Sequence, residues 1–446
     1  MGLVDVSAYD YGAPSGSLWE TLTPKLHHAY ARLEGVEACD VVVIGGGLVG
    51  LSAAWRLSED YGAKVVLIDA AEPGWGASGR MMGLAGPSPL SAYRRAAILG
   101  PDRLHQLASV DIEAKGLVNV ACEAIDTPVD RQDADLITLG VDTKIWSPMA
   151  ALALEIARAD GPQYEQLPAQ TSGEHTADHA DLPRLIMRDA TLLSPLALAR
   201  GMAEKLMARG VPVCANTRVR SLTPRGHRIE VHYRGGKIET AHVLIATNGQ
   251  SRHRSIPALR SRVMPWPFIA VASRPISPRL LADQGITRPT VFRFEDGVLG
   301  TVTVRFMSDC RLIASVDASV MRGRIQTMAQ VNNFGAWLAA RFPQLPILPL
   351  PIHWRGLGAR VGEGLPFIGP ISDAPNISYA GGTDFESVGM ALWMGRAAAM
   401  AVAYPQQAQT LPFVASEPME PYRFLQFSFR RQMRTLDKRL LEMAAV

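Results

Sequence analysis

The chain has 446 residues, of which 48% are hydrophobic and 20% are charged, and its formal net charge at neutral pH is +3. These values are typical of a globular protein with roughly two or three domains, and they exclude a strongly basic surface for nucleic acid or a membrane. The four cysteines (Cys39, Cys122, Cys214 and Cys310) form no CxxC pair. We therefore expect reduced thiols and no metal site.

Residues 1–38 are predicted to form an N-terminal arm that contains a polar helical piece from Leu18 to Leu33. The N-terminus has no basic stretch followed by an apolar one, so we expect no signal peptide and a soluble, cytoplasmic protein. The most apolar later stretch, Val388 to Ala403, contains Arg396 and is shorter than the roughly 20 residues that span a bilayer. Its Gly and Ala content instead suits a helix packed closely on a sheet.

A β-α-β unit follows the arm. Asp40 to Ile44 is a continuous apolar, β-branched run of the kind that parallel sheets bury on both faces. A glycine turn leads into a helix from Leu48 to Asp60, and a second strand runs from Lys64 to Asp69. Further along, a helix from Pro195 to Arg209 precedes short strands, a hairpin turn at Gly235-Gly236 and an apolar strand ending at Thr247.

The order of these elements predicts an α/β fold, α+β overall, in which the chain leaves one domain and later returns to it. Residues 39–100, 188–263 and 350–404 are expected to form a Rossmann-type domain with a parallel sheet. Residues 101–187 and 264–349, with a helix from Ile325 to Phe342, are expected to form a substrate domain on a mixed or antiparallel sheet. Residues 405–446 are predicted to form a tail with a basic, aromatic helix from Tyr422 to Leu441.

The glycine turn has the pattern of a dinucleotide site. Gly45, Gly47 and Gly50 form GxGxxG between the first strand and its helix, and Asp69 ends the next strand. Gly45 allows the tight turn, Gly47 lets the backbone approach a pyrophosphate, and Gly50 permits close contact between helix and strand. The helix N-terminus offers free N–H groups to phosphates. Asp69 is expected to accept hydrogen bonds from ribose hydroxyls, which argues against a 2′-phosphate ligand.

The segment after Asp69 distinguishes FAD from NAD. Pro73 to Gly83 is rich in small residues, so its backbone can follow the extended ribityl-diphosphate of FAD. Ser78 and Arg80 offer donors to phosphate or flavin, and an NAD dehydrogenase needs no such run at this point. We therefore predict FAD as the cofactor.

Four sequence features, in this order, resemble the D-amino-acid-oxidase-like FAD-dependent oxidoreductases. That family includes glycine and sarcosine oxidases and gamma-glutamylputrescine oxidoreductase. The features are SLWET (17–21), DVVVIGGGLVGLSAAWRL (40–57) with GWGASGR (74–80), VLIATNG (243–249), and HWRGLGARVGEGLPFIG (353–369) followed by YAGG (379–382). Together they span most of the chain, and the second is highly specific.

The resemblance implies further cofactor contacts. Val219 would meet the adenine through its backbone, and the strand ending at Thr247 would lie beside FAD. Gly381 and Gly382 would lead into a helix, starting near Val388, whose N-terminus points at the pyrimidine edge of the flavin. A helix N-terminus there stabilises the negative charge of reduced flavin.

Two departures from the family pattern concern the substrate. The usual Gly-His-Gly run is replaced by Thr383 to Ser387, in which Asp384 or Glu386 either pairs with a cationic amine or belongs to a helix cap. The arginine that holds the substrate carboxylate in α-amino-acid oxidases is replaced by Gly358, with Arg355 and Arg360 on either side. This favours an amine or ω-amino compound, unless one of these two arginines substitutes. A third departure, Met81-Met82 in place of Asn-Gly, is expected to change the shape of the site wall next to the flavin.

We predict an enzyme that oxidises the C–N bond of a small amine or amino acid to an imine by hydride transfer to flavin N5. The candidate catalytic residues are Trp354, Arg355, Arg360 and Asp384, although Trp354 either lines the flavin or merely packs. No dedicated base is required, because an apolar site keeps the amine neutral. The alternatives are a flavin-dependent 2-hydroxy acid oxidoreductase and a non-catalytic flavin-binding subunit. The tail would serve either to dock a partner, including a second copy in a homo-oligomer, or to pack on its own domain.

Overall fold

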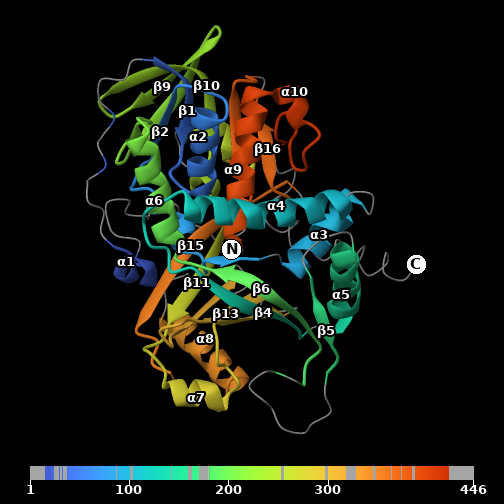
Figure 1. The fold of residues 1–446 in the computed structure, drawn as a ribbon. Helices are drawn as coiled ribbons and strands as arrows, with labels where there is room; N and C mark the ends of the chain where they lie inside the picture. The colour runs from blue at the N-terminus through green and yellow to red at the C-terminus, as the bar shows by residue number, and fades with distance from the viewer. Residues whose placement is uncertain are drawn as a thin grey trace.

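The computed structural model shows two sheets with helices packed on them, joined by several crossings of the chain (Figure 1). It describes residues 16–24, 30, 33, 38–86, 88–100, 104–141, 143–158, 163–169, 179, 181–252, 256–296, 300–317, 328–343, 345, 348–362, 364–372, 374–383 and 387–420.

The first sheet is of the predicted parallel, Rossmann type. Its main strands have the order β16-β17-β10-β1-β2-β7, and β1 pairs in parallel with both β2 and β10. The expected hairpin is present, since β9 pairs antiparallel with β10 around a turn at Arg234-Gly235. The bounds are β1 Ala38–Ile44, β2 Val65–Ile68, β7 Val213–Cys214, β8 Val219–Arg225, β9 Arg228–Tyr233, β10 Gly236–Ile245, β16 Phe367–Pro370 and β17 Ile377–Gly381.

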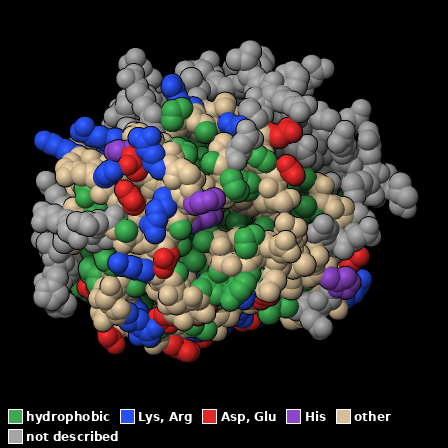
Figure 2. Space-filling model, turned by 90° about the horizontal axis from the view of Figure 1, so that it is seen from above, with side chains coloured by type: hydrophobic (Ala, Val, Ile, Leu, Met, Phe, Trp, Pro, Cys, Tyr) green, Lys and Arg blue, Asp and Glu red, His purple; other side chains and the backbone are tan. Residues whose placement is uncertain are grey.

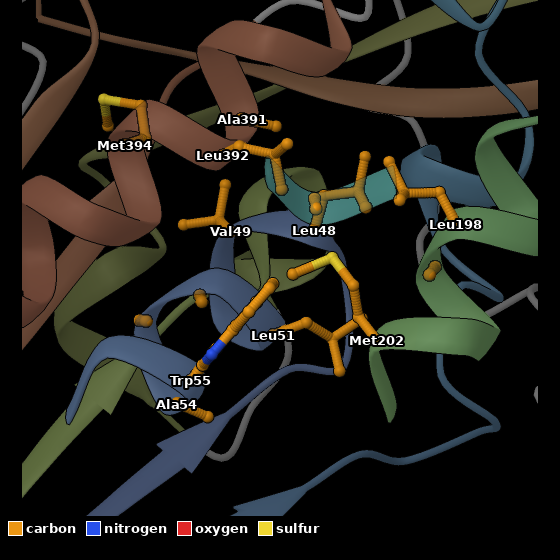
Figure 3. Close-up of a cluster of buried hydrophobic side chains, with 14 of the residues drawn as sticks. Leu48, Val49, Leu51, Ala54, Trp55, Leu198, Met202, Ala391, Leu392 and Met394 are labelled. Atoms are coloured by element: carbon orange, nitrogen blue, oxygen red, sulfur yellow. The ribbon is translucent and has the colours of Figure 1, made fainter. Parts of the chain in front are cut away.

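Three helices pack side by side on this sheet. Helix α2 (Leu48–Glu59) lies between α6 (Pro195–Ala208) and α9 (Val388–Ala403), and Figure 3 shows their apolar side chains meeting. A Cβ atom on Gly395 of α9 would lie 2.4 Å from the carbonyl oxygen of Val49. Small residues therefore allow a close approach of α9 to helix α2, whereas the sequence predicted close packing on a sheet. Helix α10 (Pro405–Ala408) follows α9.

The second sheet is mixed, also as predicted. Its order is β15-β11-β14-β13-β12-β4-β6-β3, with β5 paired to β6, and the β12–β4 pair is parallel. The bounds are β3 Leu84–Ala85, β4 Gln132–Gly140, β5 Glu165–Leu167, β6 Arg184–Leu192, β11 Val263–Ala272, β12 Thr290–Asp296, β13 Gly300–Phe306, β14 Leu312–Asp317 and β15 Ile352–Val361. The exact domain boundaries stay a prediction. Strand β15, from the span 350–404, pairs with β11 in this second sheet.

The remaining helices connect and cover the sheets. Helix α4 (Leu104–Glu123) runs across the middle of the molecule, where it packs against α9, and α3 (Pro89–Leu99) and α5 (Thr143–Arg158) lie near one of its ends (Figure 1). Helices α7 (Pro278–Asp283) and α8 (Met328–Arg341) pack on one face of the second sheet (Figure 1).

The structure corrects one predicted element. Helix α1 covers only Leu18–Leu22, because Thr23 takes an extended conformation before Pro24, whereas we expected a helix reaching Leu33. A residue that precedes proline is sterically driven out of the helical region. The predicted tail helix, Tyr422 to Leu441, lies outside the described residues. Among the described helices, none combines the length and the hydropathy needed to cross a membrane.

The surface above the first sheet carries charges of both signs close together (Figure 2). On the β9–β10 hairpin, for example, Glu230 forms ion pairs with Lys237 and Arg225. This mixture agrees with the small net charge of the chain.

Candidate active site

The glycine turn between β1 and α2 is built by close backbone contacts. Gly45 has φ +119°, and a Cβ atom there would lie 2.7 Å from the carbonyl oxygen of Ala246. A Cβ atom on Gly50 would lie 1.9 Å from the carbonyl oxygen of Gly45. Gly47 is the N-cap of α2. The turn therefore brings the N-terminus of α2 and its N–H groups to the edge of the sheet, where they favour an anion.

Asp69 follows β2 and faces the same turn. Its carboxylate accepts hydrogen bonds from the N–H of Gly46, at 2.5 Å, and of Ala71, at 2.7 Å. Burial raises the pKa of Asp69 to about 6, although these hydrogen bonds and the charge of Arg218 act in the opposite direction. The carboxylate is therefore fixed in place beside the turn, with part of its surface on a cavity.

This first cavity brings together residues from distant parts of the chain. Six of the predicted cofactor-binding residues line it: Gly45, Gly47, Asp69, Ser78, Val219 and Thr247. The Ser78 hydroxyl accepts a hydrogen bond from the N–H of Leu48, at 2.9 Å, at the first turn of α2. The cavity thus runs along the helix N-terminus and continues past the ends of β1, β2 and β10.

The N-terminal arm holds one wall of this cavity through two carbonyl groups. The Ser17 hydroxyl donates to the carbonyl of Gly79 at 2.8 Å, and the Trp19 indole N–H donates to the carbonyl of Met81 at 2.9 Å. Ser17 and Trp19 are both buried, and Met81 lines the cavity. The arm is therefore a structural part of the site.

Side chains of the second sheet bind the carbonyls of Arg80 and Met82, which alternate with the two that the arm contacts. The Trp354 indole N–H donates to the carbonyl of Arg80 at 2.8 Å, and the guanidinium of Arg305 donates to the carbonyl of Met82 at 2.8 Å. Arg305 is fully buried, and burial lowers its pKa to about 10. Four successive carbonyls, from Gly79 to Met82, are thus each fixed by a side chain from elsewhere in the chain.

A second cavity, of about 220 Å³, adjoins the first at Ser387, which lines both. Its walls come from α4, from β3 and β6, and from the start of α9. The polar groups in the lining are Asp111, Lys115, Gln163, Asp189 and Ser387. The structure therefore places a chamber with several polar groups next to the first cavity.

Residues 40–401 match the family model described as "FAD dependent oxidoreductase", known as DAO. The chain belongs to this family. It is an FAD-dependent oxidoreductase, as the sequence features indicated.

Relatives and solved structures agree with this assignment. The chain is 26% identical to the probable oxidoreductase OrdL of Haemophilus influenzae, over 84% of this chain and 85% of that protein. It is 27% identical to the gamma-glutamylputrescine oxidoreductase of Escherichia coli, over about half of each chain (51% and 53%). The fold resembles L-proline dehydrogenase from P. horikoshii, with TM-score 0.65, 17% identity and coverage of 85% of this chain and 96% of that one. Glycine oxidase from Geobacillus kaustophilus gives TM-score 0.63, 17% identity and coverage of 87% and 100%.

The first cavity fits the FAD that the family uses. A Cβ atom at Gly47 would lie 3.0 Å from the Ser78 hydroxyl, so the missing side chain keeps room beside the N–H groups of α2. These N–H groups suit a diphosphate and Asp69 suits ribose hydroxyls, so the turn would hold the pyrophosphate and Asp69 the ribose of the adenosine end. Val219 lines the same cavity, where the family resemblance puts the adenine.

Two other predicted FAD contacts, Arg80 and Gly382, contact residues of the cavity lining. The side chain of Arg80 is buried and stacks on the Trp75 ring, with its carbon Cζ 4.0 Å from the ring centroid. Trp75 itself lines the cavity. Gly382 has φ +81° and donates its N–H to the Asn248 side chain at 3.1 Å, directly after Gly381 ends β17.

Helix α9 begins at Val388, as expected. Its N-cap is Ser387, whose hydroxyl accepts a hydrogen bond from the N–H of Met390 at 3.4 Å. Ser387 and Ala391 line the FAD cavity, so this helix N-terminus does face it.

The candidate catalytic residues are spread over both faces of β15. Trp354 and Arg360 lie on one face and Arg355 on the other, because side chains alternate along a strand. Arg360 stacks on Trp266 of β11, with its Cζ 3.9 Å from the ring centroid. Their catalytic roles stay predictions, and Asp384 and Glu386 lie outside the described residues.

Sequence reasoning missed several residues of both cavities. Asn248 and Arg218 stand next to predicted residues and line the FAD cavity. Asn248 has a positive φ of 42°, and its amide also donates to the carbonyl of Thr383 at 3.1 Å. The sequence could have indicated Asn248, because it is a polar residue shortly after a buried strand. Asp111 and Asp189 gave no such signal, since isolated acids in a helix and a strand usually face solvent.

Proposed function

We propose that this FAD-dependent oxidoreductase oxidises the C–N bond of a small amine. The observation that carries the proposal is the charge of the second cavity. Among the residues that the structure describes, its lining contains two aspartates, one lysine and no arginine. Recognition of an amino acid or a 2-hydroxy acid calls for a cation placed to bind a carboxylate, most effectively an arginine. An excess of carboxylate favours a cationic substrate instead.

The residue at position 358 also favours an amine over an amino acid as the substrate. Where the amino-acid oxidases of the family carry their carboxylate-binding arginine, this chain has Gly358 on β15. The carbonyl oxygen of Gly358 would lie 2.2 Å from a Cβ atom on Gly249, so the backbone after β10 packs directly against the strand here. The neighbouring Arg360 stacks on Trp266.

FAD, when bound, would accept a hydride, which is one hydrogen together with two electrons, from the carbon next to nitrogen. The side chains that line the first cavity determine whether the bound amine is protonated. Met81, Leu357 and Ala391 give the first cavity an apolar lining beside Ser387. Such surroundings disfavour a charged ammonium and lower the pKa of a bound amine. The substrate nitrogen is therefore held neutral, with the lone pair needed to form a C=N bond as the hydride leaves.

The test is anaerobic mixing of the purified holoprotein with a panel of primary amines, α-amino acids and 2-hydroxy acids. We expect amines to bleach the visible flavin bands and the acids to leave them unchanged. Bleaching by a 2-hydroxy acid alone would replace the proposed activity with that alternative. Bands that no compound changes would favour a non-catalytic flavin-binding subunit. A cytoplasmic location and association of copies through the tail stay predictions.

A further inference from the structure

The second cavity has the size and lining of a site for a small, elongated molecule. Its volume of about 220 Å³ is below the roughly 300–1,000 Å³ of pockets for drug-sized ligands. Ala85, Ala114 and Met187 supply apolar wall, and Ser387 marks the junction with the FAD cavity. A ligand in this chamber therefore reaches FAD at one end and meets the polar groups of α4 at the other.

The two aspartates of the lining differ in their surroundings. Asp189 forms an ion pair with Lys115, and the side chains of both are well exposed, at 64% and 42%. Asp111 is partly buried, and its side chain makes no hydrogen bond or ion pair with the described part of the chain. Burial raises the pKa of the Asp111 carboxyl, and the more distant charge of Arg95 only partly opposes this. Within the described part of the chain, Asp111 is therefore a lining carboxylate with no ion-pair partner, and only the more distant Arg95 offsets its charge.

A carboxylate in this situation is costly unless a ligand supplies the missing charge. A single carboxylate is a poor site for a hard metal ion, which needs several oxygen ligands. An ammonium group needs only one such partner, together with neutral acceptors such as the side chain of Gln163. The apolar wall between Asp111 and Ser387 suits a chain of methylene groups.

We propose that Asp111 binds the distal ammonium group of a diamine, whose other amine is held neutral beside Ser387 and is the one oxidised. This deepens the amine-oxidising function proposed above and rests on it. In the reaction the reacting carbon gives a hydride to FAD, and the C–N single bond becomes the C=N bond of an iminium ion. Water then converts the iminium to an aldehyde and an ammonium ion. The distal ammonium is unchanged throughout, so it serves only recognition.

The experiment compares 1,4-diaminobutane with butylamine, which has the same chain without the second charge. Binding is measured by calorimetry on the anaerobic holoprotein, and flavin reduction is followed by absorbance. Asp111→Asn should weaken diamine binding about tenfold or more, as expected for a hydrogen bond to a charged group, and change butylamine binding less than about twofold. Glu113→Gln is the matched control, because it removes one charge from the same helix at a residue that contacts Trp393 and Arg396 instead.

The outcomes separate this proposal from the function on which it rests. If amines reduce the flavin but the diamine has no advantage that depends on Asp111, the recognition site is wrong and amine oxidation stands. If no amine is oxidised but the diamine binds in an Asp111-dependent manner, the site is supported and the proposed reaction is overturned. If no amine reduces the flavin and the diamine does not bind, both are overturned.

Discussion

Replacing Trp19 with phenylalanine tests whether the N-terminal arm is part of the FAD site. The change removes the indole N–H that donates to the Met81 carbonyl, and it keeps an aromatic ring in the same buried place. A buried carbonyl left without its donor costs about 1–3 kcal/mol. In the apoprotein the segment can relax and hydrate this carbonyl, whereas bound FAD keeps the segment against the cavity. The cost should therefore appear as an FAD affinity about 5-fold to 150-fold weaker.

Trp55→Phe is the matched control. Trp55 is also buried, but its indole nitrogen has no hydrogen-bond partner in the described part of the chain. Both variants lose the same atoms, so the difference between them isolates the hydrogen bond. The assay is titration of each apoprotein with FAD, followed by quenching of flavin fluorescence, with circular dichroism to confirm folding. Equal FAD affinities in folded Trp19→Phe and Trp55→Phe would refute a role of the arm in holding the site.

Two further predictions concern the nucleotide end of the cavity. Because burial raises the pKa of Asp69 to about 6 and ribose hydroxyls favour its ionised form, FAD affinity should be constant above about pH 6 and fall below it, by at most tenfold per pH unit. FAD titrations across this range should show weaker, pH-independent binding in Asp69→Asn, and a pH profile shared with the wild type would exclude Asp69 as its source. Gly50→Ala should abolish FAD retention, because its Cβ atom would lie 1.9 Å from the Gly45 carbonyl oxygen, whereas Gly116→Ala, with open space around it, should retain FAD. Yellow, stable Gly50→Ala protein would contradict the geometry of the turn.

The elements that the sequence predicted well carry strong local signals. The run Asp40 to Ile44, the glycine spacing that follows and Asp69 specify a β-α-β unit through short-range pattern and steric need, and β1, α2 and β2 form it. The small-residue stretch Val388 to Ala403 likewise forms α9. In each case the physical cause lies within a few residues of the feature, so a single sequence suffices to find it.

The parts that escaped prediction depend on partners far along the chain. Trp19 reads as one aromatic residue in a polar arm, and only the fold brings its indole to the Met81 carbonyl. The helix expected up to Leu33 ends at Leu22, because Pro24 drives the preceding Thr23 out of the helical conformation. Asp111 is a polar residue on an amphipathic helix, and its meaning comes from a chamber that three other elements complete. Such relations are tertiary, and no local pattern encodes them.

The position of α9 has a consequence for how the protein is made. The Ser52 hydroxyl of α2 donates to the Leu392 carbonyl of α9, across 340 positions of the chain. The glycine turn is therefore synthesised well before the helix that covers α2. Until then the apolar side chains of α2 lack their largest partner, which exposes the growing chain to aggregation. Capture of the cofactor must accordingly wait until α9 has been made, so that flavin loading can act as a checkpoint on the folding of the segment from α2 to α9.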